Sequence, residues 1–410
     1  MVRPEIIERR DEVEQTPMLD RVASIAEALQ KAGDEAQELR HMPAWGSKEM
    51  AGQGLYRMAV PRELGGENLS AREQIEAIEA AAAIDGSVGW IVQIHSETNG
   101  LVLRQMDRAL ADKVFDDWDA VVVGGLGTPN GPNPGQTARR EGDGWRLSYQ
   151  GAFASGCHNA TWAFVISPFV VDEATGEGAE YSFLVPREDF EIIDTWNSAG
   201  MRGSGSHDIR MDGTYVPPEH LLPGRALAPS QQWDGATLRN PCHAVYTKSA
   251  VALGVCKAAI ESFIDLAQKK TPWGLASPLM DMPQVHYRIG EAQATYMAAR
   301  TFMLETQDAM EANLGPGASG GGRLTPDWEV CREAYLACAH AAQAVRSVVG
   351  IINNTAGTTG SRMESPLERQ LRDAQQSATH TLITWRHYED LGKTFVGHDP
   401  AINYTELARA

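Results

Sequence analysis

Cysteine is scarce in this sequence, and no two cysteines have the spacing of a metal site. The 410 residues contain no C-x-x-C motif. The five cysteines are Cys157, Cys242, Cys256, Cys331 and Cys338. Zinc sites and disulfide frameworks need closely or regularly spaced cysteines, so this scatter argues against both. We expect reduced, mostly buried thiols and no metal site.

Long uncharged apolar runs are also missing. A transmembrane helix needs about 18 consecutive apolar residues, and the nearest candidate, residues 162–171, is short enough to be a strand. The first fifteen residues, MVRPEIIERRDEVEQ, are charged throughout and have no apolar core of a signal peptide. These absences predict a cytoplasmic protein with no membrane segment.

Basic residues are fewer than acidic residues. Lys and Arg number 36 against 54 Asp and Glu, which gives a net charge of −18. No stripe of basic residues with interleaved aromatics is present, and a net charge of this sign repels a phosphate backbone. Nucleic acid is therefore excluded as an expected partner.

The usual nucleotide-binding loops are lacking as well. Residues 315–320 match G-x-G-x-x-G by letters, but a predicted helix precedes them and Pro316 interrupts them. A dinucleotide fingerprint needs a preceding strand and a following helix that receives the pyrophosphate. We interpret residues 314–326 as a flexible linker. We expect no Rossmann unit for NAD(P)H.

The residues that are present divide into three blocks. In residues 18–118 apolar side chains recur at helical spacing, and Ser70 to Glu73 form a capping box. Residues 120–225 are short β-branched or aromatic runs separated by Gly, Pro and Asp, as in an antiparallel sandwich or barrel. Helical spacing then returns. Four long helices are predicted at 241–269, 283–312, 326–353 and 365–396.

These blocks predict a mostly α fold with a central antiparallel β domain. The predicted domains are an N-terminal helical domain (1–119), a β-sandwich or barrel (120–228) and a C-terminal four-helix bundle (229–410). A chain of this length buries about three quarters of its surface, which supports a core without disulfides or metals.

Four short motifs occur in an order typical of one family. They are VPRELGG at 60–66, FASG at 153–156 followed by WAF at 162–164, GMRGSGS at 200–206 with VP at 216–217, and RDA at 372–374. Together they resemble the acyl-CoA dehydrogenase superfamily of flavoproteins over essentially the whole chain. The resemblance implies an acyl-CoA dehydrogenase-like fold and a flavin cofactor.

The position of the catalytic base separates the two branches of that superfamily. In dehydrogenases a Glu lies seven residues beyond the Ala of Arg-Asp-Ala, and here that position is Thr381, beside His380. The family's alternative Glu position falls near Ala244, flanked by His243 and Tyr246. Neither position carries the carboxylate that would abstract an α-proton. Dehydrogenation of an acyl thioester is therefore disfavoured.

The residues found instead resemble a group of oxygenases. ASGCHNA at 154–160 is similar to the "S-S-G-C/S-D-H-A" stretch of the two-component, reduced-flavin-dependent (group D) monooxygenases, and Arg372-Asp373 followed by His380 is similar to their R-D-x(n)-H pattern. This group includes the p-hydroxyphenylacetate 3-hydroxylase oxygenase component and the secosteroid hydroxylases. The resemblance implies O2 as co-substrate and reduced FMN or FAD (FMNH2 or FADH2), supplied transiently by a separate flavin reductase.

The implied reaction is hydroxylation of a small aromatic or heteroaromatic compound, phenol- or indole-like, through a C4a-hydroperoxyflavin. Two alternatives with the same fold stay open: an acyl-CoA dehydrogenase with a displaced base, and an N-hydroxylase of amines or amino sugars. A third is a catalytically silent binding or scaffold protein. A substrate-side serine of the phenol hydroxylases has no clear match, and Thr128 in a Gly- and Pro-rich segment is its only substitute.

The resemblance also assigns site residues. The implied catalytic residues are His95, Ser155 and His380: Ser155 at flavin N5, and the two imidazoles as proton-handling groups. The implied cofactor-binding residues are Ser155, Gly156, Trp162, Ser204, Lys270, Gln284, Gly357 and Thr358. His158 departs from the family order, and His207 and His220 are predicted at the surface of the β domain. Bundles of this family pair, which implies a homotetramer.

Overall fold

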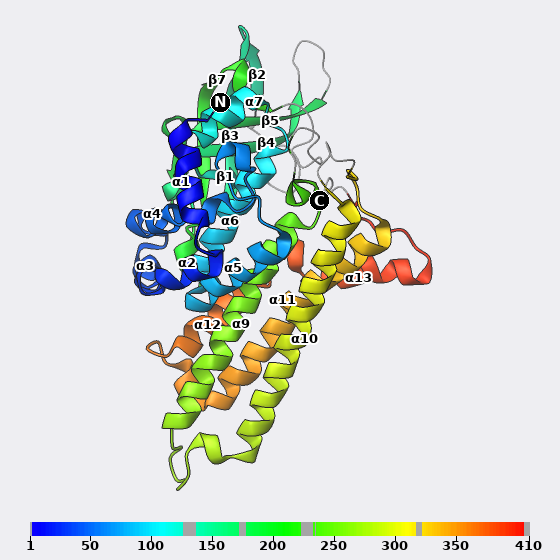
Figure 1. Cartoon of the computed structure of the whole chain (residues 1–410). Helices are drawn as coiled ribbons and strands as arrows, with labels where there is room; N and C mark the ends of the chain where they lie inside the picture. Colours follow the sequence, from blue (N-terminus) through cyan, green and yellow to red (C-terminus); the bar gives the residue numbers. More distant parts are fainter. Residues whose placement is uncertain are drawn as a thin grey trace.

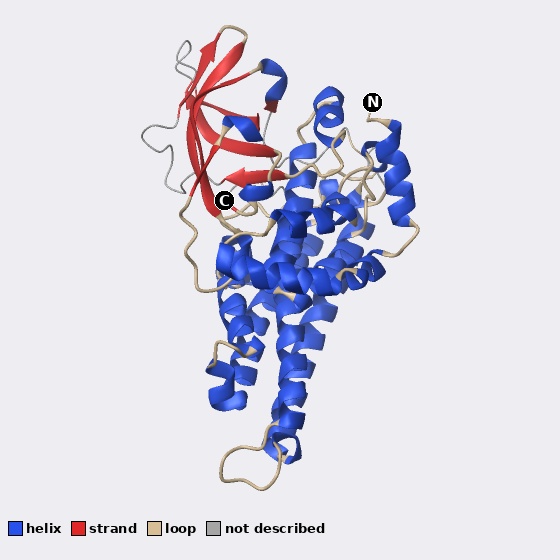
Figure 2. Cartoon of the chain, turned by 90° about the vertical axis from the view of Figure 1, so that its left-hand side faces the viewer, coloured by secondary structure: helices blue, strands red, loops and turns tan. Residues whose placement is uncertain are grey.

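The computed structural model describes residues 2–125, 137–171, 178–222, 233, 235–316 and 322–405. The two β-sheets lie at one end of the molecule and the long helices extend from the other (Figures 1 and 2). The N-terminal helices pack beside both. The three-part architecture predicted from the sequence is confirmed, whereas the domain boundaries themselves stay a prediction.

The N-terminal part is helical from residue 4 onward. Its helices are α1 (Pro4–Glu14), α2 (Met18–Ser24), α3 (Ala26–Leu39), α4 (Ala44–Gly52), α5 (Ala71–Ile84), α6 (Gly86–Leu103) and α7 (Arg108–Phe115). The predicted capping box is confirmed, because Ser70 accepts the Glu73 N–H while the Glu73 carboxylate accepts the Ser70 N–H. Asp85 follows α5 and its side chain caps α6, and the Asp107 side chain caps α7 in the same way.

The β domain consists of two four-stranded sheets. Its strands are β1 (Val122–Gly125), β2 (Thr137–Glu141), β3 (Gly144–Ala154), β4 (Trp162–Val171), β5 (Gly178–Pro186), β6 (Glu191–Ile193), β7 (His207–Val216) and β8 (Leu221–Leu222). Their orders are β1-β4-β5-β8 and β2-β3-β7-β6. The fully antiparallel expectation is wrong at one pair, because β1 and β4 run parallel. The chain passes through β2 and β3 of the other sheet between them and so returns in the same direction.

The C-terminal part contains three long helices and one broken one. The helices are α8 (Ala236–Arg239), α9 (His243–Lys269), α10 (Pro283–Leu314), α11 (Trp328–Ala356), α12 (Pro366–Ser377) and α13 (Arg386–Gly392). The continuous fourth helix expected at 365–396 is wrong. After Ser377 the Thr379 hydroxyl bonds to the Gln376 carbonyl and the His380 ring accepts the Leu382 N–H. These side chains compete with the helical ladder and turn the chain.

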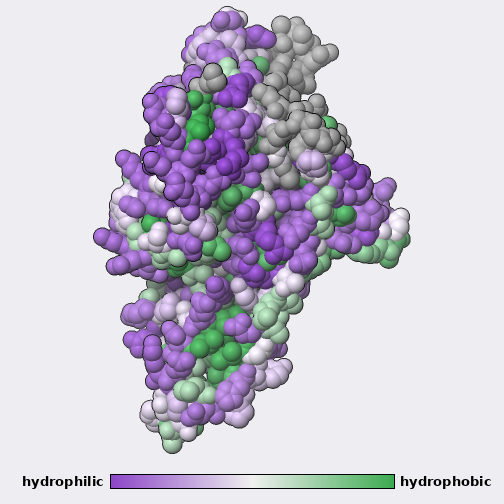
Figure 3. Space-filling model, in the orientation of Figure 1, coloured by the Kyte–Doolittle hydropathy of each residue, from purple (hydrophilic) through white to green (hydrophobic). Residues whose placement is uncertain are grey.

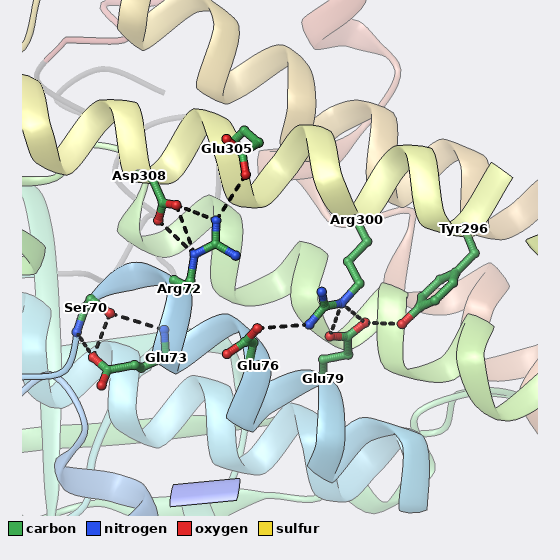
Figure 4. Close-up of polar contacts among 9 residues, drawn as sticks. All are labelled: Ser70, Arg72, Glu73, Glu76, Glu79, Tyr296, Arg300, Glu305 and Asp308. Atoms are coloured by element: carbon green, nitrogen blue, oxygen red, sulfur yellow. Dashed lines mark hydrogen bonds and ion pairs between the residues drawn. The ribbon is translucent and has the colours of Figure 1, made fainter. Parts of the chain in front are cut away.

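A polar seam fixes the N-terminal helices to the bundle (Figure 4). Arg300 of α10 pairs with Glu79 of α5 at 2.8 Å, and the Tyr296 hydroxyl donates to the same carboxylate at 2.5 Å. On the other side of α5, Gly254 lets α9 approach, since a Cβ there would lie 2.3 Å from the Glu79 carbonyl oxygen. Helix α5 is therefore held against both α10 and α9.

Two further expectations from the sequence, on the cysteines and on the glycine-rich linker, can be compared with the structure. All five cysteines are free and buried, as predicted. A helix, α10, precedes the glycine-rich linker, as expected. By length and composition alone, the helical stretch 328–361 is long and apolar enough to cross a membrane, but 61% of its most apolar window is buried inside the fold.

Candidate active site

Ser155 stands where β3 ends and the chain turns toward the helices. Its Oγ accepts a hydrogen bond from the Trp90 indole N–H of α6 at 3.1 Å and pairs with the Ser206 Oγ at 2.6 Å. Ser206 pairs in turn with the Ser204 Oγ at 2.8 Å. Ser155 is only 6% exposed. Its hydroxyl is therefore held in one orientation by partners from α6 and from the segment before β7.

The next residue, Gly156, brings His95 against this turn. Gly156 has φ +76°, and a Cβ at this position would lie 2.0 Å from the His95 Nε2. The Gly156 N–H donates to the Ser204 carbonyl at 2.8 Å. His95 is fully buried, with its ring edge-on to Tyr56. Burial lowers the pKa of His95 to about 3, so the imidazole is neutral near pH 7.

His380 approaches the same site from the turn after α12. Its ring centroid lies 5.7 Å from that of Trp90. The His380 Nδ1 accepts the Leu382 N–H at 3.2 Å, so in the neutral ring the proton is on Nε2. Burial, with the positive charge of Lys248, holds the pKa of His380 well below its ordinary value. Trp90 thus contacts both Ser155 and a neutral His380.

A buried ion pair that the sequence analysis missed joins α6 to α9 behind Trp90. The Lys248 Nζ lies 2.7 Å from both carboxylate oxygens of Glu97, and the Thr247 hydroxyl donates to the same carboxylate. The two side chains are 3% and 4% exposed. With both oxygens bonded, Glu97 is not a free base. Glu97 is the only Asp or Glu in the eighteen residues of α6, and that isolated charge was the available signal.

Two family descriptions match the chain. "Acyl-CoA dehydrogenase, N-terminal domain" matches residues 12–113 and "Acyl-CoA dehydrogenase, C-terminal domain" matches residues 246–385, together more than half of the sequence. The chain belongs to the acyl-CoA dehydrogenase family. The family predicted from the four motifs is confirmed.

Relatives of this acyl-CoA dehydrogenase-family protein are named as oxygenases. It is 24% identical to the "FADH(2)-dependent resorcinol hydroxylase, oxygenase component" of Rhizobium sp., covering 94% of this chain and 96% of that one. It is 26% identical to the "Indole-3-acetate monooxygenase" of Acinetobacter baumannii over 86% of each chain. The fold matches XiaF from Streptomyces sp. in complex with FADH2 and glycerol, with TM-score 0.83, 23% identity and coverage of 97% and 98%. The predicted fold is confirmed.

The β-domain side of the site suits a flat aromatic cofactor. Phe153, two residues before Ser155, has φ +60° and is 61% exposed, with its ring near that of Trp196. A non-glycine residue at positive φ is uncommon, and here it presents a large apolar ring to the outside beside an oriented hydroxyl. These residues of the acyl-CoA dehydrogenase-family chain fit one face of a flavin. Sequence reasoning did not assign Phe153 to the cofactor, although Phe153 is the first residue of the FASG motif.

Trp162, which was predicted to bind the cofactor, has different surroundings. Its ring lies 5.1 Å from the His220 ring and 5.7 Å from the Lys113 Nζ, and it packs against the apolar cluster under α7. Among the described residues, none of the hydrogen bonds of Ser155 involves Trp162. The structure brings Ser155, Gly156, Ser204, His95 and His380 together around Trp90, and Trp162 is not among them.

The remaining predicted cofactor residues lie at the far end of the bundle. The Lys270 Nζ donates to the Ala356 carbonyl at 2.7 Å, and a Cβ on Gly357 would lie 3.9 Å from it. Gln284 and Thr358 are exposed. Lys270 is 22 residues beyond Lys248, about 33 Å at the helical rise. Within one chain, Lys270 therefore lies at the end of α9 away from the Lys248–Glu97 pair.

Two histidines of the β domain that were given no catalytic role are more buried than expected. His207 and His220 are 2% and 4% exposed, so their predicted surface positions are wrong. The His207 Nδ1 turns inward to accept the backbone N–H groups of residues 195 and 196. His158 stacks on His41 with ring centroids 3.8 Å apart. Thr128 lies outside the described residues.

Proposed function

We propose that this protein is the oxygenase component of a two-component flavin-dependent monooxygenase, a hydroxylase of small aromatic or heteroaromatic compounds. The observation that carries the proposal is the group formed by Ser155, Trp90 and His380. A neutral imidazole stands near the position where a dehydrogenase of this family carries its glutamate. The one carboxylate of α6, on Glu97, is occupied by Lys248.

Each side chain has a defined task in this proposal. Bound reduced FMN or FAD would supply the electrons and activate O2. Ser155, fixed by Trp90 and Ser206, would bond to the flavin at N5 and hold the proton there. His380 would present its Nε2–H and hold a hydrogen bond without carrying charge, since its pKa is depressed. The buried rings of Trp90, His95 and Tyr56 would exclude water from this side of the site.

The names of relatives support this assignment. The resorcinol hydroxylase and the indole-3-acetate monooxygenase are both named as flavin-linked or oxygen-inserting enzymes of aromatic compounds. A Paenibacillus dibenzothiophene monooxygenase has the same fold, with TM-score 0.80 and 17% identity, in a complex with FMN and indole. By analogy with these relatives, we expect this chain to use reduced flavin and O2 on an aromatic substrate. We expect a separate reductase to supply the reduced flavin. Its cytoplasmic location stays a prediction.

The far-end residues support an assembly in which subunits complete each other's sites. We propose a homotetramer in which Lys270, Gly357 and Thr358 of one subunit contact the flavin of another, because Lys270 lies about 33 Å along α9 from Lys248, whose partner Glu97 is on the same helix as Trp90. Apolar side chains gather on the lower part of the bundle (Figure 3). The exposed large apolar side chains of the chain include Trp273, three residues after Lys270, and Tyr287 and Met297 of α10.

Stopped-flow mixing tests the reaction class. The protein loaded with reduced FMN or reduced FAD is mixed with oxygenated buffer, with and without indole or resorcinol. We expect a long-lived absorbance intermediate whose decay accompanies product formation when the aromatic compound is present. Bleaching of bound oxidised flavin by an acyl-CoA, without such an intermediate, would instead identify a dehydrogenase. Failure to bind either reduced flavin would identify a silent scaffold.

A further inference from the structure

The loop that orients Ser155 contains a backbone turn that other elements hold in place. This loop, residues 199–206, leads into β7. Its Ser206 Oγ pairs with the Ser155 Oγ at 2.6 Å and with the Ser204 Oγ at 2.8 Å. Met201 has φ +53°, a left-handed conformation that is uncommon for a residue other than glycine. Such a conformation persists only where the surrounding structure fixes it.

Helix α12 supplies contacts that fix the start of the loop. The Asp373 Oδ1 accepts the Met201 N–H at 2.6 Å, and the Arg372 guanidinium donates to the Ala199 carbonyl. A Cβ on Gly200, which lies between these two loop residues, would be 2.2 Å from the Arg372 carbonyl oxygen. The backbone of the loop therefore packs directly against α12.

The hydrogen bond between Asp373 and Met201 is closed to solvent. Each of the two residues is 2% exposed. The second carboxyl oxygen of Asp373 faces the start of α6, since a Cβ on Gly86 would lie 2.8 Å from it. A buried N–H without an acceptor is costly, and water has little access to replace the carboxyl group here. Loss of this acceptor should therefore displace the loop at Met201.

Helix α12 also leads to the imidazole of the site. It ends at Ser377, and His380 follows three residues later. The His380 ring lies 5.7 Å from that of Trp90, which donates to Ser155. The middle of the loop has a separate support, because the Ser87 Oγ of α6 accepts the N–H of residue 203 at 3.1 Å. Thus α12 supports Ser155 through the loop and precedes His380 in the chain.

We propose that Asp373 is a positioning residue of the oxygenase reaction, which acts through Met201 and the 199–206 loop to keep the Ser155 hydroxyl directed at the flavin. The inference rests on the proposed function, in which Ser155 bonds to flavin N5. In this role Asp373 supplies one acceptor oxygen and need not touch the flavin. An amide oxygen can replace that acceptor, whereas an apolar side chain cannot.

The lifetime of the oxygenated intermediate, measured by stopped flow with reduced FMN or FAD, tests this role. Asp373→Leu has a similar size and no acceptor, and it should shorten the lifetime about threefold. This is less than the effect expected for Ser155→Ala, because Ser87 still holds the loop. Asp373→Asn should keep the wild-type lifetime. In the Ser155→Ala background, Asp373→Leu should have no further effect, because it acts through that hydroxyl.

Amide hydrogen exchange of the flavin-free protein gives a second readout, without oxygen chemistry. The Gly156 N–H donates to the Ser204 carbonyl, so a displaced loop should release it. We expect Asp373→Leu to speed exchange in peptides that cover residues 199–206 and Gly156, and Asp373→Asn to leave both protected. If Asp373→Leu does not fold, Asp373→Ala takes its place, since it leaves room for water at the Met201 N–H.

A matched control separates positioning from stability. The Asp107 carboxylate also accepts one backbone N–H, that of Leu110 at the start of α7. Asp107→Leu should lower the midpoint of thermal unfolding and leave both the lifetime and the exchange of the loop unchanged.

Three results would overturn the proposal while wild type still forms the intermediate. They are an unchanged lifetime in Asp373→Leu, an equal shortening in Asp107→Leu, and an additive loss in the double variant with Ser155→Ala. Unchanged exchange in the loop of Asp373→Leu would do the same. Failure of the proposed function is visible in wild type alone, as the absence of flavin binding or of the intermediate, and it would remove the proposal with it.

Discussion

At the scale of single residues, the Ser155 hydroxyl is the group whose removal should alter chemistry with least effect on folding. Its partners are Trp90 and Ser206, each with a further contact. We predict that Ser155→Ala shortens the lifetime of the oxygenated intermediate about tenfold, the effect of losing one hydrogen bond in a dry site. Stopped-flow absorbance gives that lifetime directly. An unchanged decay rate would remove Ser155 from the mechanism.

The close packing of Gly156 against His95 leads to a prediction about stability. Gly156→Ala places a methyl group 2.0 Å from the His95 Nε2 at φ +76°, so the free energy of unfolding should fall by about 3 kcal/mol or more. Gly142→Ala is the control, because Gly142 has φ +64° and nothing within 4 Å. Its cost should be about 1 kcal/mol, from the backbone alone. Urea denaturation of both variants measures the difference, and equal losses would contradict the close packing on His95.

At the scale of elements, the contact between α6 and α9 depends on one buried ion pair. Lys248→Met leaves the Glu97 carboxylate buried without its counter-charge, and we expect a loss of about 3–5 kcal/mol in the free energy of unfolding. The double variant Glu97→Gln with Lys248→Met should recover much of this loss. The exposed pair Arg362–Glu364, with side chains 71% and 77% exposed, is the control. Breaking it should leave the free energy of unfolding nearly unchanged in the same urea titration, because solvent screens an exposed pair. If the double variant instead loses as much stability as the two single variants together, the Glu97 and Lys248 side chains are not coupled.

At the scale of the whole molecule, a pair of buried carboxyl groups joins the three parts of the chain. The Asp373 Oδ1 of α12 accepts the Met201 N–H from the segment before β7 at 2.6 Å. The Asp85 carboxylate, at the start of α6, pairs with Arg369 of α12. Burial, and then the negative charge of Asp85, raise the pKa of Asp373 to about 7, while Arg369 and Arg372 oppose the rise.

This junction predicts a pH dependence of stability. The ordinary pKa of the Asp373 carboxyl, 3.8, is below its value in the fold, so the unfolded chain loses this proton first as the pH rises. The contribution of protonated Asp373 is complete below about pH 4 and is lost as the pH rises to about 7. Asp373→Asn cannot ionise. The stability of wild type relative to this variant should therefore fall between pH 4 and 7 and stay constant above that, as measured by thermal unfolding. A flat difference across this range would contradict the raised pKa.

The sequence by itself determined the family, the order of helical and strand segments, the capping box of Ser70 and Glu73, and the cluster of Ser155, Gly156 and Ser204. These features depend on local periodicity, on side chains that bond to nearby backbone groups, and on motifs whose residues are close together in the sequence. Only the tertiary structure decided that β1 pairs in parallel with β4, that the fourth long helix breaks at Ser377, and that the Trp162 ring lies against His220 and Lys113. It also revealed the Glu97–Lys248 pair. Burial and pairing join residues about 150 positions apart, and no local pattern records which of them meet.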